Sequence, residues 1–88
     1  MRLVQYHVSN NIVRDVKEIE KCIDRGEYVL IVSHGELSEG WKAYVKCKIK
    51  HSENIGYYNL DRNKEDKARV AYARYLMQFE SVEQRGQK

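Results

Sequence analysis

The chain has 88 residues, of which 42% are hydrophobic and 33% are charged, and its net charge at pH 7 is +3. This length suits one domain with a small core, and the composition excludes a disordered chain. Its longest apolar run, Tyr28 to Val32, is far too short for a membrane span, and Met1 is followed by no apolar leader. We therefore expect a single domain over residues 1–88, located in the cytoplasm and outside the membrane.

The first third of the chain predicts a helix between two candidate strands. Residues 1–8 alternate loosely between apolar and polar side chains, which favours an optional edge strand. Residues 28–32 are continuously apolar and mostly β-branched, which favours a second strand. Between them, apolar residues recur every three or four positions at Ile12, Val16, Ile19 and Ile23. This period predicts a helix over residues 12–25, with Asn10 or Asn11 as its cap and Gly26 just beyond its end.

The middle of the chain contains the clearest alternation. From Trp41 to Lys50, apolar and polar residues alternate for ten positions, which is typical of a strand with one buried face. We therefore expect Val45, Cys47 and Ile49 to be buried there. The preceding segment, residues 33–40, contains two glycines and no apolar period, so it predicts a hairpin loop.

The last third predicts one more strand and one more helix. A short strand is expected around Ile55 to Leu60, and Asn63 can cap a helix from Lys64 to about Phe79. Residues 81–88 are polar and are expected to fray. The helix has an apolar stripe formed by Ala68, Tyr72, Tyr75, Leu76 and Phe79.

These elements give the order α-β-β-β-α, with an optional first strand before it. Strands joined by short turns pair antiparallel, and helices then cover one face of the sheet. The predicted fold is therefore α+β, with a three-stranded antiparallel sheet and two helices packed on one face.

Catalytic and metal sites are not indicated by the residue spacing. Cys47 and His51 form the one close pair of potential zinc ligands, whereas zinc sites usually contain two such pairs. Ser33 and His34 are adjacent, so on a regular strand they point to opposite faces and do not act together. No phosphate-binding glycine motif is present. We therefore expect no enzyme activity, no cofactor and no metal, with Cys22 and Cys47 as buried reduced thiols.

Basic residues supply the strongest candidate for a binding surface. On the predicted strand, Lys42, Lys46, Lys48 and Lys50 project on one face together with Tyr44, and alternate positions lie about 7 Å apart. Such a row can follow a phosphate backbone, and Tyr44 with Tyr57 or Tyr58 can offer stacking faces to bases. The alternative is an ordinary solvated sheet face. The last helix adds the basic residues Lys64, Lys67, Arg69 and Arg74.

Two segments resemble the double-stranded-RNA-binding domain. Residues 27–35, followed by a loop and by residues 41–49, look like the first hairpin of that family, with an aromatic residue opening the second strand. Residues 68–77 are similar to its alanine-rich last helix. The resemblance covers about residues 12–79 and implies an α-β-β-β-α fold in which small helix residues pack closely on the sheet.

Two functions follow from this sequence. The first is a non-catalytic module that associates with RNA or a nucleoprotein assembly through its lysine-lined sheet face. The second is an inhibitor of the kind that phages encode, which binds a host protein that processes nucleic acid. Phosphate contacts weaken steeply as salt rises, whereas a mostly apolar protein interface does not, so salt dependence distinguishes them.

Overall fold

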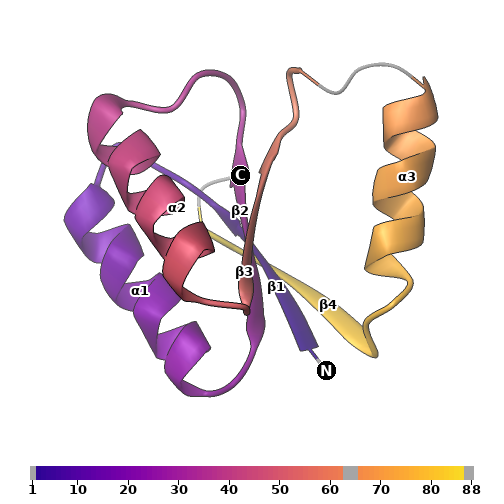
Figure 1. The fold of residues 1–88 in the computed structure, drawn as a ribbon, viewed down its shortest axis with the longest axis horizontal. Helices are drawn as coiled ribbons and strands as arrows, with labels where there is room; N and C mark the ends of the chain where they lie inside the picture. Colours follow the sequence, from indigo (N-terminus) through magenta and orange to yellow (C-terminus); the bar gives the residue numbers. More distant parts are fainter. Residues whose placement is uncertain (1, 63–65, 87–88) are drawn as a thin grey trace.

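The computed structural model describes residues 2–62 and 66–86, and in the last helix it describes side chains from Val70 onward. Strands and helices alternate along the chain (Figure 1). They are β1 (Arg2–His7), α1 (Ile12–Asp24), β2 (Tyr28–Ser33), α2 (Glu39–His51), β3 (Ile55–Asn59), α3 (Asp66–Leu76) and β4 (Ser81–Gly86).

The four strands form one sheet in the order β3-β2-β1-β4, and every neighbouring pair is parallel. This overturns the predicted three-stranded antiparallel sheet and the α-β-β-β-α order that the family resemblance implied. The chain moves outward from β1 to β2 and β3, and then crosses back to place β4 on the other side of β1. The strand order therefore reverses between β1 and β4.

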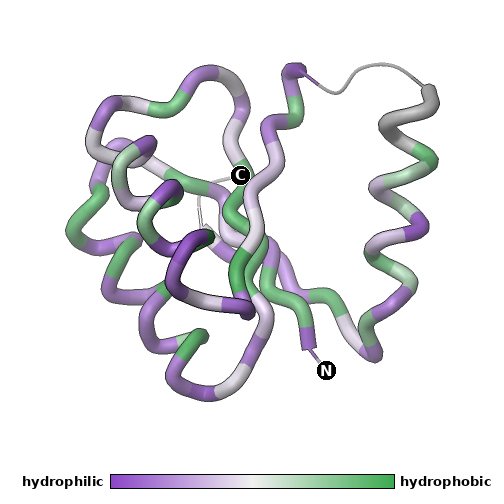
Figure 2. The backbone as a smooth tube through the Cα atoms, viewed as in Figure 1, coloured by the Kyte–Doolittle hydropathy of each residue, from purple (hydrophilic) through white to green (hydrophobic). Residues whose placement is uncertain are grey.

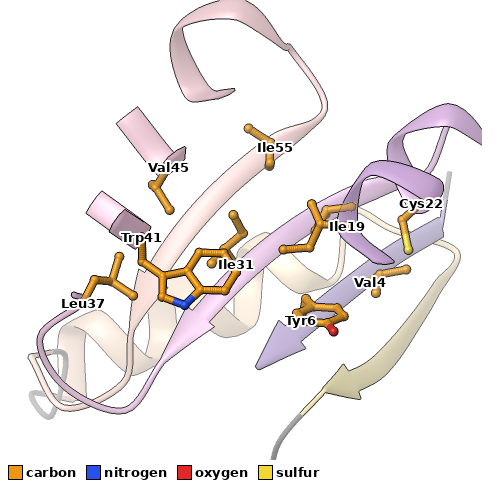
Figure 3. Close-up of a cluster of buried hydrophobic side chains, with 10 residues drawn as sticks. Val4, Tyr6, Ile19, Cys22, Ile31, Leu37, Trp41, Val45 and Ile55 are labelled. Carbon is orange, nitrogen blue, oxygen red and sulfur yellow. The ribbon is translucent and has the colours of Figure 1, made fainter. Parts of the chain in front are cut away.

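Helices cover both faces of the sheet rather than one. Figure 1 shows α1 and α2 on one side and α3 on the other. On the α1 and α2 side, Ile19, Trp41 and Val45 pack on Val4 and Ile31 from the two central strands (Figure 3). A smaller cluster on the α3 side is centred on three buried strand residues, Leu3, Leu30 and Val32. Three layers with a buried parallel sheet are the expected result of strands joined through helices.

The segment predicted as the alternating strand forms α2, which is the main error of the sequence interpretation. Trp41 and Val45, four residues apart, are buried on one side of this helix, whereas Cys47 is exposed and Ile49 is 48% exposed. The Ser38 hydroxyl accepts a hydrogen bond from the Trp41 backbone N–H at 3.3 Å and so caps the helix start. Residues 33–40 accordingly connect a strand to a helix and do not form a hairpin.

Both ends of the chain also differ from expectation. The N-terminal strand is central rather than at an edge, because β1 pairs with both β2 and β4, and five of its six residues are buried. Its loose alternation reflects two covered faces. Residues 81–86, expected to fray, form β4 along the far side of β1. A polar strand of this kind carries no sequence period that would reveal it.

The other elements agree with the sequence. Helix α1 begins after Asn11, whose side chain accepts a hydrogen bond from the Arg14 N–H, and Gly26 beyond its end has φ +78°. Strands β2 and β3 lie where predicted. The last helix is confirmed in a shorter form. Of the predicted apolar stripe, Tyr72, Tyr75 and Leu76 of the helix and Phe79 beyond its end pack on the Leu30 side of the sheet. Its predicted cap Asn63, with Lys64, lies outside the described residues, as does the side chain of Ala68.

The two cysteines behave differently. Both are free thiols, as predicted, and Cys22 is fully buried on α1. Cys47 is exposed, contrary to expectation, because it lies on the outer side of a helix and not on the inner face of a strand.

Within residues 2–62 and 66–86, no helix has the length and apolar character that crossing a bilayer requires.

Replacement of Gly86 by alanine tests how closely β4 is docked. Gly86 has φ +84°, and a Cβ there would lie 2.2 Å from the backbone oxygen of His7. Gly26 also has a positive φ, but a Cβ there meets nothing within 4 Å, so Gly26→Ala is the matched control. We expect Gly26→Ala to cost about 1 kcal/mol, and Gly86→Ala to cost at least about 1 kcal/mol more, in urea unfolding. Equal losses would contradict the docking of β4 on β1.

Candidate functional site

A cleft of about 460 Å³ opens at the carboxyl edge of the sheet, beyond the ends of β1 and β2. Its walls are the connection from β1 to α1 and the connection from β2 to α2, and both helices begin beside it. Apolar residues and polar residues share the lining: Val8, Ile12, Leu37 and Trp41 with Ser9, Asn10, Ser33, His34, Glu36 and Ser38, together with Gly35 and Gly40. Ligands of open parallel sheets bind at this edge.

The first wall is held by a buried carboxylate. Asp15, in the first turn of α1, has no exposed surface. Its Oδ2 accepts hydrogen bonds from the Ser9 backbone N–H and hydroxyl, both at 2.7 Å, and its Oδ1 accepts one from the Tyr6 hydroxyl at 3.0 Å. The Arg14 guanidinium lies 3.3 Å from the same Oδ1. The loop after β1 is therefore fixed to the helix that follows it.

These contacts shift the ionisation of both partners. Burial by itself raises the pKa of Asp15, but the hydrogen bonds from Ser9, Tyr6 and Arg14 outweigh it and hold the pKa below its usual range. Burial and the neighbouring Asp15 carboxylate raise the pKa of Tyr6. Asp15 is therefore ionised and Tyr6 neutral at physiological pH.

The second wall is joined to the first through Trp41. The indole Nε1 of Trp41 donates a hydrogen bond to the Ser9 backbone oxygen at 3.1 Å, so α2 is bonded to the loop after β1. Gly40 contributes to the same junction, because a Cβ there would already be in contact, at 3.4 Å, with the Ile12 side chain of α1. The spacing of the two helix starts is thus set by direct contacts between them.

Backbone donors are concentrated on the second wall. Among the described residues, the N–H groups of Gly35 to Ser38 donate no hydrogen bond to another protein group. Gly35 has φ +131°, a conformation that favours glycine, and the Ser33 hydroxyl fixes it by donating to its carbonyl oxygen at 2.9 Å. Helix α2 adds the N–H groups of Glu39 and Gly40, which precede the first backbone hydrogen bond of the helix, and the positive end of its dipole.

A histidine pair lies beside these donors. His34 is exposed and lines the cleft, whereas His7, at the end of β1, is 8% exposed. The Nδ1 of His7 lies 3.2 Å from the Nε2 of His34, and the ring centroids are 5.4 Å apart with 24° between the ring planes, so the two rings meet through these nitrogens. The Nδ1 of His34 is therefore the nitrogen left for a ligand.

Acidic side chains at the rim are compensated by nearby cations. Glu36 forms ion pairs with Arg62 and with Lys42, whose Nζ lies 3.6 Å from its carboxylate. The same Nζ lies 3.6 Å from Glu39. Among the described residues, no three His, Cys, Asp or Glu side chains gather as a metal ion would require.

A more open hollow of about 560 Å³ lies beside the cleft, at the point where the strand order reverses. It is lined by Tyr6, Arg14, Glu18 and Gly86. Two of these side chains, Tyr6 and Arg14, are already bonded to Asp15. The hollow consequently offers fewer unengaged polar groups than the cleft does.

The predicted lysine row is divided between two sides of α2. Lys46 and Lys50 are exposed and form no ion pair with a described residue, and Lys42 lies one turn before them. Lys48 instead lies 2.6 Å from Glu20 of α1, and the Tyr44 hydroxyl donates to the same carboxylate at 2.7 Å. Burial alone would raise the pKa of Glu20. The hydrogen bonds from Lys48 and Tyr44 outweigh burial, so the pKa of Glu20 is below its usual value.

The remaining candidate residues do not join this surface. Arg74 is exposed on α3, across the sheet from α2, and Lys64 lies outside the described residues. Lys67 and Arg69 belong to α3, but their side chains are not among those described. Tyr57 packs against the larger cluster and Tyr58 stacks on Tyr72 with ring centroids 4.1 Å apart, so both tyrosines are packing residues.

Sequence reasoning missed most of the cleft. The sequence pattern indicated Ser33 and His34 only as a possible catalytic pair and Asn10 only as a possible helix cap, and it gave no role to Ser9 or Asp15. A serine or asparagine directly after a buried strand and before a helix is the signal that was available, because these side chains cap helices. It becomes informative only when the strands are known to be parallel.

Asp15→Asn tests the network behind the cleft. Loss of the charged acceptor should lower the free energy of unfolding by about 2 kcal/mol at neutral pH. Because the pKa of Asp15 is lowered by folding, its contribution is complete above the ordinary carboxyl pKa of about 4 and disappears as the pH falls through its folded value. The difference between wild type and variant, measured by urea unfolding, should therefore narrow below about pH 4.

Asp24→Asn, at the exposed end of the same helix, is the control and should change stability little. A stability difference for Asp15→Asn that is independent of pH would refute the ionised network.

Comparison with known proteins gives no relative for this chain. No family model matches it, and neither the curated proteins nor the solved structures contain a match.

Proposed function

We propose that the chain binds a small phosphate-bearing ligand in the cleft at the carboxyl edge of the sheet. The observation that carries the proposal is that the residues from Gly35 to Ser38, whose four N–H groups have no acceptor among the described residues, line one cleft together with the start of α2 and the exposed His34. Backbone N–H groups at a helix start present partial positive charge to anions.

The size and lining of the cleft support such a ligand. Its volume of about 460 Å³ falls within the range of roughly 300–1,000 Å³ of small-molecule sites. The apolar side of the lining, formed by Val8, Ile12 and Leu37, suits the uncharged part of a ligand. Glu36 does not oppose an anion strongly, because Arg62 and Lys42 pair with it.

A second candidate function is association with nucleic acid, and RNA in particular, through α2. This helix contains four lysines and one histidine against one glutamate. Figure 2 shows hydrophilic residues recurring along α2. Lys42, Lys46 and Lys50 follow one another at intervals of four residues, or about 6 Å along a helix, which is similar to the spacing of phosphates on a strand.

Three further expectations stay predictions from the sequence. They are a location in the cytoplasm, the absence of catalytic chemistry and the alternative of a phage-type inhibitor that binds a host nucleic-acid-processing protein.

Replacement of His34 tests the first proposal. Titration of wild-type protein with inorganic phosphate and with adenosine monophosphate should shift the backbone amide resonances of residues 35–40. Adenosine, which has no phosphate, should shift them much less. His34→Ala should weaken phosphate binding about tenfold, because a hydrogen bond to a charged group is lost. His51→Ala removes an exposed histidine at the far end of α2 and should leave binding unchanged.

The second candidate is tested by charge removal on α2. Lys46→Gln with Lys50→Gln should reduce affinity for a short duplex RNA and lower the slope of log affinity against log salt by up to about 0.9 per engaged lysine. Lys17→Gln with Lys21→Gln is the matched control, since these lysines are exposed at the same spacing on α1. Equal effects of the two pairs would indicate unspecific charge attraction, and no binding at low salt would exclude this function.

A further inference from the structure

The histidine pair joins the buried end of β1 to the cleft. Strands β1 and β2 are adjacent and parallel, with His7 opposite Val32, so His34 lies just beyond the end of the neighbouring strand. His7 is held in the sheet by pairing on both sides, and a Cβ on Gly86 would lie only 2.2 Å from its backbone oxygen. His7 is therefore the fixed member of the pair, and the exposed His34 adjusts to it.

A contact between two nitrogens of neutral imidazole rings couples the tautomer of one ring to the tautomer of the other. At 3.2 Å, the Nδ1 of His7 and the Nε2 of His34 share one hydrogen bond, so one nitrogen carries a proton and the other accepts it. If His7 donates, a neutral His34 carries its own proton on Nδ1. If His34 donates instead, its Nδ1 holds a lone pair.

We propose that His7 is a positioning residue that donates from Nδ1 to the Nε2 of His34 and thereby makes the Nδ1–H of His34 a donor to the ligand. This inference rests on the proposed function, because phosphate oxygens at neutral pH chiefly accept hydrogen bonds. A His34 with a lone pair on Nδ1 would face those oxygens with another acceptor. The donors of Gly35 to Ser38 and His34 then address the same anion.

The tautomer of His34 is directly measurable in the free protein. In a long-range ¹H–¹⁵N correlation spectrum of ¹⁵N-labelled wild type at neutral pH, the Nδ1 of His34 should show the shift of a protonated nitrogen and Nε2 that of an acceptor. Addition of inorganic phosphate should move the Nδ1 resonance together with the amides of residues 35–40. This measurement needs no variant, so it does not depend on whether a substitution at a buried position folds.

Two substitutions test the role of His7. His7→Phe keeps a planar ring but removes the donor, so His34 should change to a mixture with substantial Nε2–H tautomer and phosphate binding should weaken about fivefold. His7→Gln keeps an N–H donor and should retain more of the Nδ1–H tautomer and of the affinity. Weaker binding with an unchanged tautomer in His7→Phe would mark His7 as merely structural and overturn the inference.

The outcomes for the two proposals differ. A free wild-type protein whose His34 is protonated on Nε2 overturns the positioning role, even if phosphate still shifts the cleft amides. Amides that do not respond to phosphate refute the proposed function, and the ligand-directed role of His7 falls with it whatever the tautomer of His34.

Discussion

The cleft depends on the buried carboxylate of Asp15. It bonds to Tyr6 on β1 and to Ser9 in the loop after that strand, while belonging itself to α1. Ser9 in turn accepts the indole N–H of Trp41 from α2. One chain of hydrogen bonds therefore connects the end of a central strand to the first turns of both helices beside the cleft. Removal of one partner leaves the buried charge with fewer hydrogen bonds, which is costly in a low-dielectric interior.

This arrangement separates rigid groups from adaptable ones. The walls of the cleft are fixed by Asp15 and Trp41, whose side chains are almost entirely buried. The groups available to a ligand are backbone amides and the exposed His34 ring, which need no large rearrangement to bind. Preorganised donors lose little conformational entropy on binding, which is what the proposed site needs for a small anion that makes few contacts.

The elements with one clear period were predictable, and those that depend on topology were not. Helix α1 has a helical period of apolar residues and capping residues at its ends. Strand β2 is a continuous apolar run, which is typical of a strand buried on both faces. The segment from Trp41 to Lys50 satisfies a period of two by coincidence, since Trp41 and Val45 also lie one helical turn apart. The cap at Ser38 was the signal that distinguished the two, and strand β4 gave none.

The error in topology also explains why the site was missed. In an antiparallel sheet the end of the first strand and the end of the second lie at opposite edges, so Ser9 and His34 would be far apart. Parallel pairing of β1 with β2 brings both ends to one edge, where two loops and two helix starts meet. The lysines illustrate the converse, because the same four residues that line one face of a strand divide between two sides of a helix. Residue type alone could not place these residues. Strand direction decides whether Ser9 and His34 lie at the same edge of the sheet, and the helical period decides how the lysines divide around α2.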